Sequence, residues 1–205
     1  MAADRLAELV HDGFDLGFVS TSEQTTAYAR GLGLEVLDID CVESIDVTID
    51  GADEVGPRLD LIKGLGGALL REKIVASMTE KEVIVVDEFK VVDRLGTSAP
   101  LPVEVCGFAH VATARALEGL GCEPVLRLKD GRPFVTDGGN LIYDCRFDGI
   151  DDPSYLETAI DTIPGVVECG LFVGLTHAVE AYREEDDSVI ELRITDRRVG
   201  PRGSP

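Results

Sequence analysis

The sequence predicts an α/β protein, in which a Rossmann-like parallel sheet with helices on both faces carries an inserted ferredoxin-like α+β subdomain. Two observations lead to this prediction. In the first half of the chain, segments with helical periodicity alternate with short apolar runs, which is the pattern of βαβ units and a parallel sheet. After the proline-rich stretch "APLPVEV" at 99–105, the order changes to β-α-β-β-α, which is that of a split ferredoxin-like unit.

The first unit begins with "AADRLAELV", which has helical spacing, and continues with the short apolar strand "LGFVS". The segment "STSEQTTAYARGLG" predicts a second helix, with Ser20 or Thr21 as its N-cap and Gly31 or Gly33 as its stop. Next come "LEVLDI" and the alternating strand "SIDVTID", which ends in acidic residues. "GGALLREKIVASM" then predicts a helix, and "KEVIVVDE" predicts a buried parallel strand.

The second unit contains a strand within 99–105, the helix "AHVATARALEGLG" and the strand "EPVLRL". Asp130-Gly131 between two apolar runs predicts a hairpin turn. "PFVTD" and "NLIYDCRF" follow, and Pro153 marks the first turn of the helix in "DDPSYLETAI". We expect "VVECGLFVGL" and "SVIELRI" to return to the first sheet. The expected boundaries are 1–99 and 166–195 for the Rossmann-like domain, 100–165 for the ferredoxin-like subdomain, and 196–205 for a disordered tail.

The composition excludes several classes of function. The 205 residues include 39 acidic and 19 basic ones, and the net charge of −20 argues against a nucleic-acid-binding face. The absence of a long apolar run and of a signal pattern predicts a cytoplasmic protein without a membrane span. Only five basic residues are lysine, and acidic residues occur throughout, which favours adaptation to molar salt. The alternative, a solvating acidic tail, fits only "REEDD" at 183–187.

The sequence predicts no metal and no cofactor. The five cysteines show neither C-x-x-C pairing nor a nearby histidine cluster, which argues against structural zinc and against a disulfide framework. The histidines His11, His110 and His177 are scattered, and we expect them at the surface or in helices rather than as ligands.

Two aspartates follow the strand "SIDVTID" directly. In parallel α/β sheets, ligands bind beyond the carboxyl ends of the strands, so Asp50 and Asp53 are expected at the rim of a binding site. Aspartate also favours turns, and the alternative that both residues only cap the next segment stays open.

The stretch "LIKGLGGALLREK" combines Lys63, a glycine-rich turn and Glu72. It is not a P-loop, because the lysine precedes the glycines, and it lacks the third glycine of a dinucleotide loop. An anion-binding turn and a plain helix entry both remain open. A helix that begins near Gly66 or Gly67 would place Glu72 about one and a half turns in.

Taken together, these segments bring two aspartates, a glutamate and two lysines toward one rim, since "VVDEFKVVD" places Lys90 at the end of the next strand. Such a set suits proton transfer beside a carbonyl group, where negative charge develops on oxygen in the transition state.

The motifs "TIDGADEV", "LIKGLGGALLREKIVAS", "VVDEFKVVDRLG", "PLPVEV", "KDGRPFVTDGGNLIYD" and "IPGVVECGLFVGL" resemble type A ribose-5-phosphate isomerase, in order, from about residue 15 to 175. The resemblance implies interconversion of ribose 5-phosphate and ribulose 5-phosphate in the non-oxidative pentose phosphate pathway. It also implies a sugar phosphate as the partner, and a homodimer or homotetramer.

At matching positions, the resemblance makes Glu72 the proton-abstracting base and Lys63 the group that stabilises the enediolate. It makes Asp50 and Asp53 sugar-binding residues, one of them involved in ring opening, and Lys90 a further substrate-binding residue. The implied substrate-binding set is Asp50, Gly51, Ala52, Asp53, Lys63, Gly64, Leu65, Gly66 and Lys90.

The sequence departs from the family pattern at two places. Leu65 stands where the family has glycine, which adds a side chain to the loop. The family also begins with a strand and a Gly/Ser/Thr-rich phosphate-binding turn, and we expect the chain as given to start past this turn. Besides an isomerase, a non-catalytic sugar-phosphate sensor, an inactive truncated relative and an assembly protein of this fold stay open.

Overall fold

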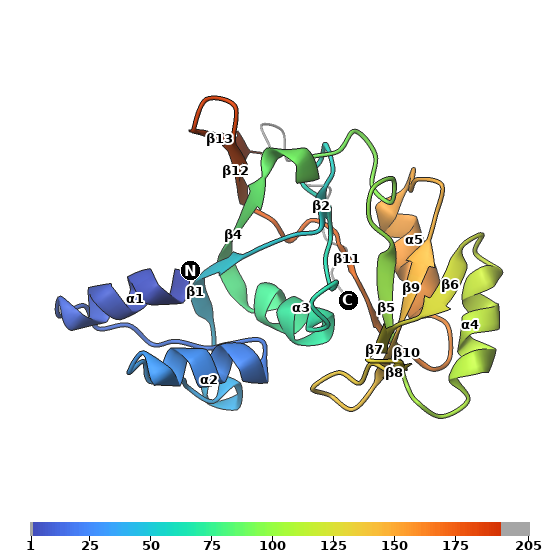
Figure 1. Cartoon of the computed structure of the whole chain (residues 1–205), viewed down its shortest axis with the longest axis horizontal. Helices are drawn as coiled ribbons and strands as arrows, with labels where there is room; N and C mark the ends of the chain where they lie inside the picture. Colours follow the sequence, from blue (N-terminus) through green and yellow to red (C-terminus); the bar gives the residue numbers. More distant parts are fainter. Residues whose placement is uncertain (1, 194–205) are drawn as a thin grey trace, which may run out of the picture.

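The computed structural model describes residues 2–193 (Figure 1). The first half contains α1 (Ala2–His11), α2 (Glu23–Gly31), η1 (Ile39–Cys41), β1 (Ile45–Asp50), β2 (Glu54–Val55), β3 (Leu61–Ile62), α3 (Leu69–Ser77), β4 (Thr79–Asp87) and η2 (Glu88–Lys90). The second half contains β5 (Leu101–Val105), α4 (His110–Glu118), β6 (Glu123–Leu126), β7 (Leu128–Lys129), β8 (Arg132–Pro133), β9 (Leu141–Arg146), α5 (Pro153–Asp161), β10 (Val166–Cys169), β11 (Leu171–Phe172), β12 (Ala178–Arg183) and β13 (Ser188–Arg193).

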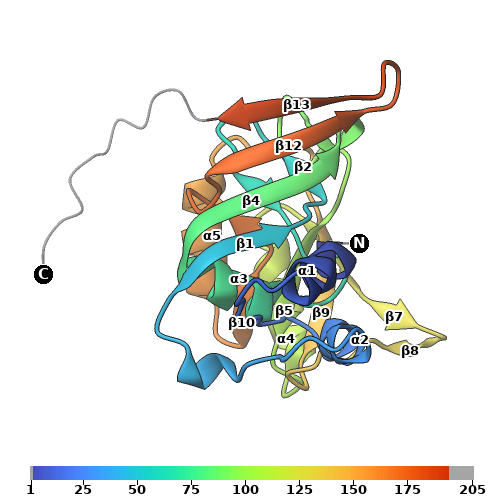
Figure 2. The same cartoon turned by 90° about the vertical axis from the view of Figure 1, so that its left-hand side faces the viewer.

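The first sheet has the strand order β1-β4-β12-β13. The β1–β4 pair is parallel, as predicted, and β4 also pairs in parallel with β12, a strand that the sequence analysis does not predict. "SVIELRI" returns to this sheet as the antiparallel edge strand β13. Helix α3 packs on one face, and α1 and α2 lie on the opposite side near β1 (Figures 1 and 2). Their cover is incomplete, because Val47, Ile49 and Val85 on that side are 51%, 51% and 50% exposed.

The second sheet has the order β10-β5-β9-β6, with every pair antiparallel. This is the strand order of a β-α-β-β-α-β unit, whose fourth strand lies beside its first. The sequence predicts that 166–169 returns to the first sheet, and this prediction is wrong, because β10 pairs with β5. After Gly170, Leu171 and Phe172 form β11, which pairs with β3 in a small sheet completed by β2.

Other differences from the sequence-based expectations are local. The predicted strand "LGFVS" forms only an isolated bridge between Phe18 and Val36. Ser22, rather than Ser20 or Thr21, caps α2, and its Oγ accepts a hydrogen bond from the backbone N–H of Thr25. The predicted tail at 196–205 lies outside the described residues.

Two hydrophobic clusters hold these layers together. One packs the second sheet against α4 and α5, and the other packs the first sheet against α3 and the small sheet. Lys73 links α3, which packs on the first sheet, to the second unit. Its Nζ lies 3.0 Å from Glu157 Oε1 in α5 and 2.6 Å from Glu168 Oε1 in β10. Within residues 2–193, no helix has the length and apolar character needed to cross a membrane.

Candidate active site

Three charged side chains from different elements meet beside the first sheet. Asp50 is the last residue of β1, Lys63 directly follows β3, and Glu72 lies in the first turn of α3. Lys63 Nζ is 2.8 Å from Asp50 Oδ2 and 3.4 Å from Glu72 Oε2. The structure thus brings together the residues that the sequence predicts to be catalytic.

The glycine-rich loop determines how Lys63 and Glu72 approach each other. Gly64 and Gly67 have φ values of +107° and +88°, a backbone conformation that residues other than glycine rarely adopt. A Cβ at Gly64 would also lie 2.9 Å from the Cβ of Leu69. The helix therefore begins at Leu69, later than predicted, and Glu72 lies within its first turn.

The ammonium group of Lys63 is held almost completely out of solvent. The residue is 3% exposed, its Nζ donates to the carbonyl of Gly51, and it lies 5.4 Å from the centroid of the Phe172 ring. Its backbone N–H donates to Gly170 O over 2.9 Å. Burial by itself would lower the pKa of Lys63, but the carboxylates of Glu72 and Asp50 outweigh it and raise the pKa.

The other predicted binding residues line the adjoining loops. Asp53 Oδ2 accepts a 2.9 Å hydrogen bond from the backbone N–H of Leu65, which joins the aspartate loop to the glycine loop. Lys90 Nζ donates to Ala52 O over 2.9 Å, so η2 places it beside the same loop. The side chain that departs from the family pattern, that of Leu65, is 45% exposed. Gly66 has no atom within 4 Å of an added Cβ, so this position is open.

Burial and neighbouring charges control the protonation of Glu72. Burial raises its pKa, Lys63 lowers it, and Asp50 raises it again, so that the net pKa lies above the usual glutamate value. A raised pKa brings a carboxylate closer to the working pH at which a general base is most effective.

Two further residues near this cluster are not identified from the sequence. Glu82, in the middle of β4, is 1% exposed, and burial raises its pKa to about 7, with a further contribution from Asp50 and an opposing one from Lys63. A signal for it exists, because positions 82, 84 and 86 share one face of the strand and the other two are the apolar Ile84 and Val86.

The second residue is Arg127, which joins the ferredoxin-like unit to the glycine loop. Its Nη1 donates to Gly64 O over 2.8 Å and to Leu65 O over 3.1 Å, while its Nε and Nη2 bind Asp144. No local pattern marks this arginine, since its partners in the glycine loop are some sixty residues away in the sequence.

One group within residues 2–193 has the spacing of metal ligands, namely Asp161, Glu168 and Cys169. The ammonium group of Lys73 lies 2.6 Å from Glu168 Oε1, and it already supplies positive charge at this place. We therefore assign the group to the link between α3 and the second sheet.

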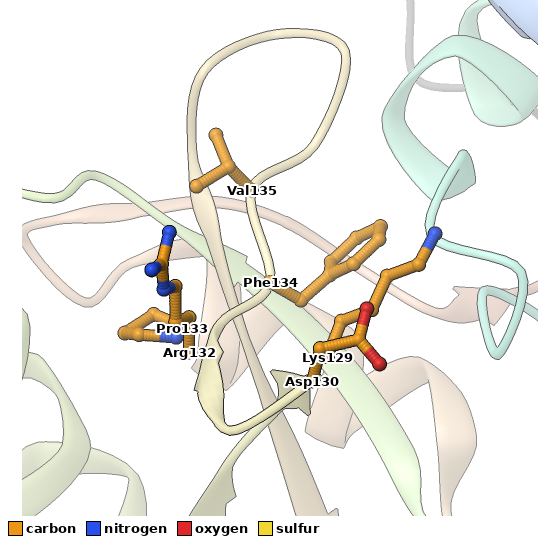
Figure 3. A pocket seen from close by; sticks show the side chains of 6 residues that line it. All are labelled: Lys129, Asp130, Arg132, Pro133, Phe134 and Val135. Carbon is orange, nitrogen blue, oxygen red and sulfur yellow. The ribbon is translucent and has the colours of Figure 1, made fainter.

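A surface hollow lies at the β7–β8 hairpin, outside the charged cluster (Figure 3). Phe134 is turned to one side of the hollow, and Arg132 and Val135 to the other. The Phe134 ring packs so closely against Gly67 that an added Cβ there would lie 2.5 Å from it. The hairpin thus supports the glycine loop, and Asp130-Gly131 forms its turn as predicted.

Comparison with known proteins gives consistent matches over most of the chain. Residues 17–186 match the family model of ribose 5-phosphate isomerase A (phosphoriboisomerase A). A ribose-5-phosphate isomerase A from Gloeobacter violaceus is 54% identical over 87% of this chain and 78% of its own length. One from Thermomicrobium roseum is 49% identical over 95% of this chain and 83% of its own length.

Solved structures agree with these sequence matches. A D-ribose-5-phosphate isomerase in complex with phospho-erythronic acid is 37% identical, with a TM-score of 0.89 over 93% of this chain and 84% of that one. Ribose 5-phosphate isomerase from Plasmodium falciparum is 35% identical, with a TM-score of 0.88 over 95% of this chain and 86% of that one.

Proposed function

Because this chain belongs to the ribose 5-phosphate isomerase A family, we propose that it interconverts D-ribose 5-phosphate and D-ribulose 5-phosphate through a cis-enediolate. This aldose–ketose isomerisation is a step of the non-oxidative pentose phosphate pathway. The observation that carries the proposal is the position of Lys63, whose ammonium group is within ion-pair distance of both Asp50 and Glu72.

Glu72 is the base that moves the proton between the two reacting carbons. Its carboxylate removes the proton from C2 of the open-chain aldose, and the electron pair left behind forms the enediolate with the C1 oxygen. A proton then moves from the C2 oxygen to the C1 oxygen, and the same carboxyl group, now protonated, returns its proton to C1, so that the C2 carbonyl forms and the product is the ketose. The raised pKa of Glu72 makes its carboxylate a stronger base for the removal of this proton.

Lys63 stabilises the negative charge that develops on the substrate oxygen. A cation in a buried site acts through a low effective dielectric, and its orientation is set before the reaction begins. Asp50, the Gly51 carbonyl and the Phe172 ring hold the ammonium group in place. These contacts keep Lys63 charged, because the carboxylates raise its pKa.

The remaining predicted residues bind the sugar. The carboxylates of Asp50 and Asp53 can accept hydrogen bonds from hydroxyl groups, and Lys90 supplies a second positive charge beside the same loop. Gly51, Ala52, Gly64, Leu65 and Gly66 contribute the backbone of the two loops. The hydrogen bond from Leu65 to Asp53 keeps these loops at a constant separation.

Three further expectations from the sequence belong to this proposal. The enzyme acts in the cytoplasm, forms a homodimer or homotetramer, and works in molar salt because of its net charge of −20. The alternative of a non-catalytic sensor is not favoured, since the named relatives are isomerases and Glu72 is present.

The test is to incubate this chain with ribose 5-phosphate in low salt and in multimolar potassium chloride. The formation of ribulose 5-phosphate measures the reaction. We expect turnover, and a higher rate in the concentrated salt. A folded chain that binds ribose 5-phosphate in both solutions and produces no ketose would overturn the isomerase proposal in favour of the sensor.

A further inference from the structure

The buried carboxyl group of Glu82 lies near the charged cluster of Asp50, Lys63 and Glu72. In the parallel β1–β4 pair, Glu82 is opposite Thr48, and Asp50 is opposite Ile84. Since side chains alternate along a strand, Glu82 and Asp50 lie on the same face of the sheet, the face on which α3 carries Glu72. Glu82 is 1% exposed, and its Oε2 has no hydrogen-bond partner within residues 2–193.

The cluster has more carboxyl groups than positive charges. Asp50, Glu72 and Glu82 share a single neighbouring ammonium group, that of Lys63. If every carboxyl group were ionised, the cluster would carry two uncompensated negative charges in a buried place, which is strongly unfavourable. Such a cluster keeps a proton, and the carboxyl group with the fewest stabilising contacts is the one that holds it.

The contacts identify that carboxyl group. Asp50 is the best stabilised, with a 2.8 Å ion pair to Lys63 and a 2.8 Å hydrogen bond from the Gly51 N–H to its Oδ1. Glu72 is 3.4 Å from Lys63, and its side chain keeps 15% of its surface exposed. Glu82 is more deeply buried than either. Like Glu72, it has an oxygen without a hydrogen-bond partner, but within residues 2–193 it forms no ion pair with Lys63, whereas Asp50 and Glu72 both do.

We propose that Glu82 is a positioning residue that holds the proton of the cluster, so that Glu72 stays ionised as the base and Lys63 keeps its charge for the enediolate. This inference rests on the proposed isomerase function. Glu82 acts through Glu72 and Lys63 and needs no contact with the sugar.

The proposal implies a pH dependence, since the pKa of Glu82 is raised to about 7, and ionisation above that pH adds a negative charge beside the developing enediolate. The charged groups that face it are Asp50 from β1, Lys63 after β3 and Glu72 from α3. The His177 ring before β12 is also close, and its Nδ1 accepts the Glu82 backbone N–H over 3.0 Å.

The first experiment compares the pH profiles of kcat/KM for wild type, Glu82→Gln and the matched control Glu80→Gln, which changes an exposed glutamate of the same strand. In wild type and the control, we expect kcat/KM to fall by about tenfold between about pH 6 and pH 9. In Glu82→Gln, whose side chain stays neutral, the same ratio should change by less than about twofold. A profile for Glu82→Gln that parallels wild type would overturn the proposal.

The second experiment measures the carboxyl titration directly, by carbon-13 NMR of glutamate-labelled protein. A glutamate with a midpoint near 7 should appear in wild type and in Glu80→Gln and be missing from Glu82→Gln. Its persistence in Glu82→Gln, or its absence from wild type, would overturn the assignment. This readout needs no turnover, so a chain that does not convert ribose 5-phosphate would refute the proposed function and still decide the role of Glu82.

Discussion

Glu104 and Glu82 occupy similar places in the two sheets, but their surroundings differ. Each lies on a strand that faces a core, and each is 1% exposed. Glu104 Oε1, in β5, accepts hydrogen bonds from Thr136 Oγ1 over 2.8 Å and from Asn140 Nδ2 over 2.9 Å. Glu82, in β4, keeps an unpartnered oxygen beside a cluster already rich in carboxylates.

A third buried glutamate supports the same distinction. Glu54 is fully buried, and its carboxylate accepts backbone N–H groups of Gly96, Ser98 and Ala99. Glu54 and Glu104 therefore hold loops in place with satisfied hydrogen bonds. The cluster around Lys63 instead contains two carboxylate oxygens, on Glu72 and Glu82, without a hydrogen-bond partner, which costs stability. This difference separates the carboxyl groups that stabilise the fold from those that we propose take part in the reaction.

The largest expected effect is on activity, at the centre of the cluster. Glu72→Gln should lower kcat by at least about 10³-fold, because the amide cannot accept the substrate proton. Binding of ribose 5-phosphate, measured by calorimetry, should change by less than about threefold, and the melting temperature should stay the same or rise. Activity of Glu72→Gln close to wild type would remove Glu72 from the role of base.

The next effect is on stability, in the second sheet. Glu104→Ala leaves the donors of Thr136 and Asn140 without their acceptor and should lower the free energy of unfolding by about 3 kcal/mol. Denaturant titration in constant salt measures this loss, and Glu104→Gln, which keeps one acceptor oxygen, should lose less. Equal stability of Glu104→Ala and wild type would contradict the contrast with Glu82.

Removal of the positive charge of Lys63 tests its proposed role in the reaction. Lys63→Met keeps an apolar stem against Phe172 and removes the ammonium group. We expect kcat to fall by about 10²-fold, with a smaller change in the dissociation constant of ribose 5-phosphate, since Lys63 interacts most strongly with the charged transition state. A weakened affinity with unchanged kcat would make Lys63 an anchor for the substrate.

The smallest expected effect is the pH dependence of stability due to Glu82. Its pKa of about 7 in the folded state exceeds the ordinary value of 4.5, so its contribution to stability is fully present below about pH 4.5 and is lost as the pH rises through 7. The full shift corresponds to about 3 kcal/mol, and adjustment of the neighbouring groups reduces the expected difference to about 2 kcal/mol.

Glu82→Gln removes this pH-dependent contribution. The variant should therefore gain stability relative to wild type between about pH 5 and pH 8, measured by denaturant titration at several pH values. Glu80→Gln serves again as the control and should parallel wild type. A constant difference between Glu82→Gln and wild type at all pH values would show that Glu82 does not titrate in this range.

The sequence by itself determined the types of most elements and the members of the predicted site. Periodicity predicts β1, β4, α3 and α5 because burial on one face of an element follows the spacing of its own residues. Asp50, Lys63 and Glu72 could be predicted because each stands at a local signal, namely a strand end, a glycine turn or a helix start, and the structure then brings them within ion-pair distance.

Only the tertiary structure decided which strand pairs with which, where α3 begins, and which distant residues support the site. The strand β10 joins the second sheet through its pairing with β5, and α3 starts only at Leu69, after Gly67 with its φ of +88°. Arg127 and Glu82 owe their roles to partners that are distant in sequence. Local spacing sets the shape and polarity of each segment, whereas the burial of a charge depends on which segments the folded chain places around it.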